Sequence, residues 1–188
     1  MPLMTKFEDS VPVRVRSLNY HGLTNMAARI DEWSRIKGWR SNPPRPTKRL
    51  LMLVVTEIAE AAESFRTWSD FQMTDKGIPL SNFEEEMADV GVRLLDMFSE
   101  FDIELNDELV LRWADSTIFD TSEPLNTLYE LCRRVVVDLD QASLGDVLHG
   151  SLAGLFWISW AYQFDLMKAI ELKMDYNDTR PFKHGKNV

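Results

Sequence analysis

The chain has 188 residues, of which 45% are hydrophobic and 27% charged, so it is long and apolar enough to bury a core. Its formal net charge of −9 argues against general nucleic-acid binding, which needs a basic surface to neutralise phosphates. The single cysteine, Cys132, excludes an intrachain disulfide, and without a Cys/His cluster a structural zinc site is not expected.

The longest apolar run, from Leu152 to Tyr162, is much shorter than the roughly 20 residues that a membrane-spanning helix requires. No signal-peptide pattern precedes it. We therefore expect a soluble, cytoplasmic protein with no membrane or nucleic-acid partner. An acidic chain of this kind would bind an anionic substrate through a metal ion.

Helices are expected wherever apolar residues recur every three or four positions between helix breakers. Such residues predict a first helix from Leu23 to Ile36, ending near Gly38, and the proline-rich stretch 41–46 cannot continue it. A possible capping box of Ser81 and Glu84 would begin the third helix. The later helices are expected over about residues 47–68, 81–98, 105–115, 125–139, 143–162 and 165–176.

Strand signals are nearly absent, so the expected fold class is all-α, a helical bundle that forms a single domain over residues 1–188. An internal similarity leaves a second organisation open, because Phe101-Asp102-Ile103 recurs as Phe164-Asp165-Leu166 after a long apolar helix. As a tandem duplication, the halves would span 20–117 and 123–180. Glu86 and Asp89 would then face His149 and Leu152, so the second half would lack the carboxylates.

Two carboxylate pairs stand out on successive predicted helices, Glu57-x-x-Glu60 and Glu86-x-x-Asp89. Residues three apart lie on the same face of a helix, so each helix presents a pair of acids sideways. Both pairs border apolar residues, and a carboxylate near a core is costly unless it is paired or bound to a cation. The two helices can therefore converge on a shared metal site.

Oxygen-only ligation favours Mg²⁺, with Mn²⁺ as the alternative, and leaves coordination positions for water and substrate phosphates. This arrangement suits cleavage of a phosphoanhydride. The competing interpretation is that the acids are surface charges on solvated helix faces. The neighbouring Glu63, Glu84, Glu85 and Asp96 could be surface charges as well, although Asp96 falls two turns beyond Asp89 on the same face.

The two pairs, separated by 25 residues, resemble the ExxE and ExxD helices of the MazG-like all-α nucleoside triphosphate pyrophosphohydrolases, a superfamily that includes dCTPases and dimeric dUTPases. The segment from Lys173 to Lys186 resembles the K…N..R……GK tail of the same family. The chain departs from the simplest family pattern in the extra segment from Glu123 to Tyr162, which separates the ExxD helix from this tail.

This resemblance implies hydrolysis of a (deoxy)nucleoside triphosphate to its monophosphate and pyrophosphate, as part of nucleotide-pool house-cleaning. All four acids would be both catalytic residues and Mg²⁺ ligands, with one glutamate deprotonating the attacking water. The implied substrate-binding residues are Lys173 and Arg180 toward phosphate, Asn177 toward the nucleotide, and also Trp39, Lys48 and Tyr176.

The aromatic residues Tyr176 and Phe182 could stack on a base. Trp39 is either a base-stacking wall or a packing residue. A homodimer or homotetramer is implied by the family, and the apolar run from Leu155 to Trp160 would suit either a subunit interface or a core helix.

Two other functions compete with the pyrophosphohydrolase. A di-iron carboxylate bundle would need Glu-x-x-His pairs, and the nearest match is the single Asp146-Val147-Leu148-His149. A non-catalytic helical module for nucleotide sensing or protein interaction would retain the scaffold without turnover. The intact set of four acids argues against this module, because a binding protein has little reason to tolerate them.

Overall fold

The computed structural model describes residues 22–67, 72–117, 119–120, 122–137 and 142–182. Within these ranges the chain is helical, and an isolated bridge between Met73 and Ser81 is the one strand-like pairing. The helices are α1 (Leu23–Ile36), α2 (Thr47–Arg66), α3 (Asn82–Glu100), α4 (Asp107–Ser116), α5 (Pro124–Val137), α6 (Leu144–Ala161) and α7 (Leu166–Thr179). The predicted all-α class is confirmed for this part of the chain.

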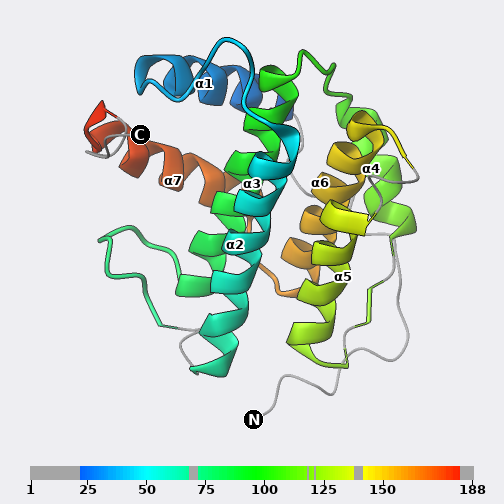
Figure 1. Ribbon diagram of the computed structural model, residues 1–188. Helices are drawn as coiled ribbons and strands as arrows, with labels where there is room; N and C mark the ends of the chain where they lie inside the picture. The colour runs from blue at the N-terminus through cyan, green and yellow to red at the C-terminus, as the bar shows by residue number, and fades with distance from the viewer. Residues whose placement is uncertain (1–21, 68–71, 118, 121, 138–141, 183–188) are drawn as a thin grey trace.

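Helix α3 lies at the centre of the molecule, in contact with α1, α2, α6 and α7 (Figure 1). Most of its residues are buried, and they are distributed around the helix rather than along one stripe. This is the pattern of a helix that is covered on several sides. The charged residues of α3 therefore lie in unusually enclosed surroundings.

Helix α6 is the second enclosed helix, and each residue from Val147 to Ser159 is buried. The apolar run that begins at Leu155 therefore belongs mainly to the core of the chain itself; only Trp160 at its end is half-buried. No helix in the described ranges combines the length and apolarity needed to cross a membrane.

The helices pack in a pattern that is repeated along the chain. Helix α2 packs on α3, and α5 packs on α6; α7 then lies on α3 and α4 lies on α6. If α2, α3 and α4 are replaced in order by α5, α6 and α7, and the reverse, the set of packed pairs stays the same. Helix α1 breaks this pattern, because it covers α3 and α7 (Figure 1).

The two central helices also begin and end alike. Ser81 and Ser143 cap their first turns with the side-chain oxygen, Ser81 in the predicted capping box with Glu84. Both helices end in a left-handed residue, Asp102 with φ 53° and Gln163 with φ 60°. The same two backbone hydrogen bonds close each end, which is a Schellman motif.

These helix ends change the register of the internal similarity. Phe101 is the C-cap residue of α3, and the residue in the same position after α6 is Tyr162. Phe164, which the sequence alignment matched to Phe101, lies two residues further on. The alignment that matched Glu86 to His149 therefore changes as well. Equivalent positions are defined by the backbone geometry of the helix ends and not by the shared Phe-Asp dipeptide.

The connection between α1 and α2 is held to the C-terminal end of α3 by ion pairs. Arg40 and Arg45 both contact Asp96 and Glu100, and Arg40 also contacts Asp31. The Glu100 side chain is 1% exposed, and although burial opposes the shift, the two arginines hold its pKa below the ordinary value. Asp96 is therefore paired with two arginines and is not a free surface charge.

Candidate metal centre

Helices α2 and α3 bring three of the four predicted acids together. One oxygen each from Glu57, Glu60 and Glu86 lies within 4.8 Å of the other two. Burial of Val54, Ile58 and Ala61 against the core fixes the rotation of α2, so that its acids face the border with α3. Glu57 is buried, Glu86 half-buried and Glu60 exposed, which gives the cluster an enclosed side and an open side.

Glu86 is the electrostatically strained member of the cluster. Burial, followed by the charges of Asp89 and Glu85, raises its pKa to about 8. At neutral pH this carboxyl group therefore carries a proton for most of the time in the absence of a cation.

The fourth acid, Asp89, lies beside the cluster and is paired with a buried lysine. Lys173 Nζ is 2.5 Å from Asp89 Oδ2 and also contacts Glu85, and the lysine and Glu85 side chains are each 2% exposed. Burial alone would lower the pKa of Lys173, but the two carboxylates raise it above its ordinary value. Burial raises the pKa of Asp89, although Lys173 opposes the shift.

Glu85 joins the loop between α2 and α3 to this ion pair. Thr74 and Lys76 of the loop both donate to the Glu85 carboxylate. Burial would raise the pKa of Glu85, but hydrogen bonds from Lys173, Lys76 and Thr74 hold it below the ordinary value. Glu85 is thus a structural anchor rather than a surface charge.

Sequence reasoning missed the arginine that lies on the cluster. Arg93 Nε and Nη2 both donate to the same oxygen of Glu57, Oε1, at 3.0 and 2.9 Å. Arg93 lies one helical turn after Asp89 and two turns after Glu86, so the same spacing argument that joined the acids could have found it.

Asn177 lies one turn after Lys173 on α7 and is 4% exposed. Its side-chain oxygen is buried without a hydrogen-bond partner in the described part of the protein. A buried acceptor of this kind is costly unless a ligand or water donates to it. Tyr176 is half-buried, and Arg180 ends the helix with its carbonyl oxygen bound by Lys37.

The remaining predicted substrate-binding residues are not brought to the acids. Lys48 is exposed in the first turn of α2, and the nine residues to Glu57 correspond to about 14 Å of helix. Trp39 is half-buried beside Arg40, which is bound to the far end of α3. The ring of Phe182 lies against Gly38, and the rest of the predicted tail, 183–186, lies outside the described residues.

His149 is not available as a metal ligand. Its Nδ1 is 2.7 Å from the Gly145 carbonyl oxygen, and its Nε2 accepts from the backbone N–H of Asn106 at 3.0 Å. Together these contacts specify a neutral ring with the proton on Nδ1. A di-iron site built on Asp146 and His149 therefore finds no support in this geometry.

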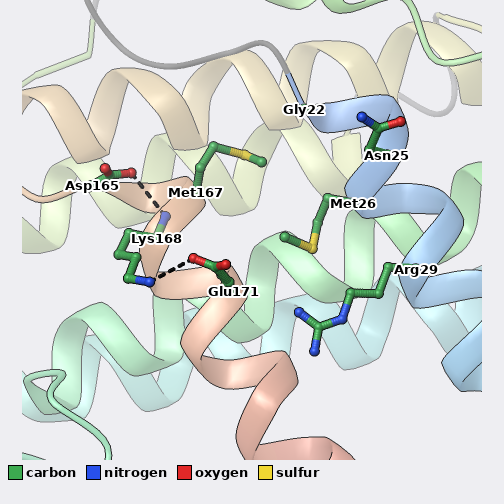
Figure 2. Close-up of a pocket in the computed structure, with 8 residues that line it drawn as sticks. All are labelled: Gly22, Asn25, Met26, Arg29, Asp165, Met167, Lys168 and Glu171. Carbon is green, nitrogen blue, oxygen red and sulfur yellow. Dashed lines mark hydrogen bonds and ion pairs between the residues drawn. The ribbon is translucent and has the colours of Figure 1, made fainter.

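A cavity of about 380 Å³ opens between the first turns of α1 and α7, away from the acids (Figure 2). Its lining includes Met26, Arg29, Lys168 and Glu171. Lys168 is paired with Glu171 at 2.7 Å, while Arg29 is paired with Asp175 and Asp178 on α7. The basic groups of the cavity are therefore already neutralised by neighbouring carboxylates.

No protein-family model, curated protein or solved structure matches this chain. The chemistry of the cluster must therefore be judged from its own atoms. Three carboxylates with oxygens this close repel one another, and a hard divalent cation with oxygen ligands relieves the repulsion. The residues present thus fit a divalent cation held by Glu57, Glu60 and Glu86.

Proposed function

We propose that this chain is a MazG-like nucleoside triphosphate pyrophosphohydrolase that needs Mg²⁺, or Mn²⁺ in its place. It would cleave a (deoxy)nucleoside triphosphate to the monophosphate and pyrophosphate. The observation that carries the proposal is the approach of Glu57, Glu60 and Glu86 within 4.8 Å across two helices. Convergence of acids from separate helices is costly unless a cation is bound there, above all for Glu57, which is buried.

The bound cation would neutralise the phosphates and lower the pKa of the attacking water. We assign the acceptance of the water proton to Glu86. Glu57 is engaged by Arg93, and a cation bound beside Glu86 would favour its deprotonated form, which is the form that accepts a proton. Water would attack the α-phosphorus, and the bond to the bridging oxygen would break to release pyrophosphate.

We propose that Lys173 positions Asp89 at the edge of the site rather than contacting phosphate itself. Its buried ammonium group is already held by Asp89 and Glu85, which leaves it little freedom to reach a ligand. Asn177, with its unpartnered oxygen, would accept from an N–H or O–H group of the nucleotide. Arg180 and Tyr176 lie on the same helical tail and would border the nucleotide.

We further propose that the chain arose by tandem duplication of a helical unit and that only the first half retains the acids. The last helix of each half packs on the central helix of the other half, α7 on α3 and α4 on α6, and this reciprocal packing supports the proposed origin. The matching ends of α3 and α6 support it as well. Related oligomeric enzymes bring two such units together as separate subunits, so homodimer or homotetramer formation by this chain would build on an internal pseudo-dimer.

The test of the proposed function is a product assay with purified protein, Mg²⁺ and a panel of canonical and modified nucleoside triphosphates. We expect monophosphate and pyrophosphate from at least one nucleotide, with the rate reduced about 100-fold or more in Glu60→Gln. Glu63→Gln, on the exposed face of the same helix, is the matched control and should retain activity.

Release of single phosphates would contradict the proposed bond cleavage. Equal loss of activity in Glu60→Gln and Glu63→Gln would contradict the proposed site. Binding of nucleotides without any turnover would indicate the non-catalytic helical sensor instead.

A further inference from the structure

Arg93 occupies an unusual place between the acid cluster and solvent. The Glu57 side chain is 11% exposed, whereas the Arg93 side chain that covers it is 40% exposed. Two of its N–H groups converge on Oε1 of Glu57, and no other acceptor of Arg93 is recorded in the described residues. The guanidinium group therefore retains donors for a further anion.

The other basic side chains near the cluster are already paired with carboxylates. Lys173 is buried between Asp89 and Glu85, and Lys76 is bound to the same Glu85 carboxylate. Arg93 is the half-exposed positive charge that touches a member of the acid triad. A planar guanidinium group also matches the geometry of phosphate oxygens better than an ammonium group does.

We propose that Arg93 binds the polyphosphate of the substrate, bridging Glu57 and a phosphate oxygen at the mouth of the cation site. This inference rests on the proposed function, because it requires a cation site at the triad. It assigns the phosphate-binding task to α3 instead of the C-terminal tail. Charges would then alternate from Glu57 to Arg93 to phosphate to the bound cation.

The proposal has a consequence that a purely structural role would not produce. A positive charge beside Glu57 repels a divalent cation at the triad but attracts an anionic ligand. Removing the charge should therefore tighten cation binding and weaken polyphosphate binding. Loss of a structural ion pair would weaken both together.

The experiment uses the full chain and two probes, Mn²⁺ followed by electron paramagnetic resonance and inorganic triphosphate followed by calorimetry at saturating Mn²⁺. For Arg93→Gln we expect the Kd of Mn²⁺ to fall about threefold or more and that of triphosphate to rise about tenfold or more. Arg93→Lys should keep the wild-type Mn²⁺ affinity but bind triphosphate about threefold more weakly, because lysine lacks the fork. Arg112→Gln, exposed on α4, controls for net charge and should change neither Kd.

Weaker binding of both probes by Arg93→Gln would overturn the proposal, as would unchanged triphosphate binding in this variant. Absence of Mn²⁺ binding by the wild-type chain would overturn it together with the cation site. The readouts need no turnover, so the two ideas can fail separately. Opposite shifts in a chain that hydrolyses no nucleotide would support Arg93 and refute the hydrolase.

Discussion

At the scale of single residues, two of the four acids of the candidate site have a positive partner and two have none recorded in the described residues. Glu57 is paired with Arg93, and Asp89 with Lys173, so each carries a nearby positive charge. For Glu60 and Glu86, no ion pair is recorded within the described residues, and the pKa of the half-buried Glu86 is raised to about 8. The negative charge that is not compensated within the site therefore lies beside Glu86, where a cation would offset it.

Glu86→Gln is expected to stabilise the cation-free protein at alkaline pH. The pKa of Glu86 rises from 4.5 to about 8, so between these values the folded chain keeps a proton that the unfolded chain loses. The stability that this group contributes is therefore fully present below about pH 4.5 and is lost as the pH rises through 8.

Urea denaturation with a chelator present should show a gain for Glu86→Gln of about 1–2 kcal/mol near pH 8.5, after discounting for partial exposure. The gain should nearly vanish near pH 5. Glu63→Gln, on an exposed carboxylate of α2, is the control. A difference between variant and wild type that does not change with pH would show that Glu86 is an ordinary surface acid.

The sequence predicted which acids share a helix face, because a spacing of three residues determines that directly. It did not predict the ion pairs, because the partners come from different elements: Lys173 lies 88 residues from Glu85, and Arg93 of α3 pairs with Glu57 of α2. The sequence also left open that Glu85 and Asp96 are surface charges, and their ion pairs with residues of other elements exclude this. The spacing of residues shows which face of a helix a side chain lies on, but it does not show which other element packs against that face.

At the scale of elements, helix positions followed from periodicity and caps. The Ser81 capping box begins α3 as predicted, and α1 ends before Gly38, whose φ is 76°. Helix α4 begins at Asp107 rather than near Leu105, because the Asn106 side chain caps it. Such boundaries depend on one side-chain hydrogen bond, which periodicity does not detect.

Glycines within the helices mark where neighbouring elements approach closely. A Cβ atom on Gly91 of α3 would lie 2.6 Å from Ile170 Cδ1 of α7. Gly91→Ala should therefore lower the free energy of unfolding by about 1–3 kcal/mol through overpacking, despite the better helix propensity of alanine. Chemical denaturation measures this directly.

The double variant Gly91→Ala with Ile170→Val removes the clashing methyl group and should recover most of the loss relative to Ile170→Val alone. Gly145→Ala is the matched control, because a Cβ there meets Ile103 at an ordinary 3.5 Å. It should be neutral or slightly stabilising. Equal effects of both glycine substitutions would mean that α7 does not rest on α3 at Gly91.

At the scale of the whole molecule, the packing of the helices on one another could not be predicted from the sequence. The all-α class could be predicted from the sequence. The packing of α7 on α3 and of α4 on α6 could not, because the apolar stripe of one helix can pack against any helix with a complementary surface (Figure 1). This packing of α7 on α3 is what brings Lys173 of the last helix to Asp89 and Glu85 of the first half.

The shape of the molecule also separates the cavity between α1 and α7 from the acid cluster. The cavity is lined by residues near the N-terminal ends of α1 and α7 (Figure 2). The acids lie at the border of α2 and α3. A cation at this border would join two of the central helices. Binding should therefore stabilise the fold as a whole.

The most direct test of this account is cation binding itself, because it does not depend on choosing the right nucleotide. Mn²⁺ should bind the wild-type chain and raise its Tm, and Glu60→Gln should lose both effects while Glu63→Gln retains them. If Mn²⁺ binds both variants alike, or does not bind the wild-type chain, then Glu57, Glu60 and Glu86 do not form a metal centre.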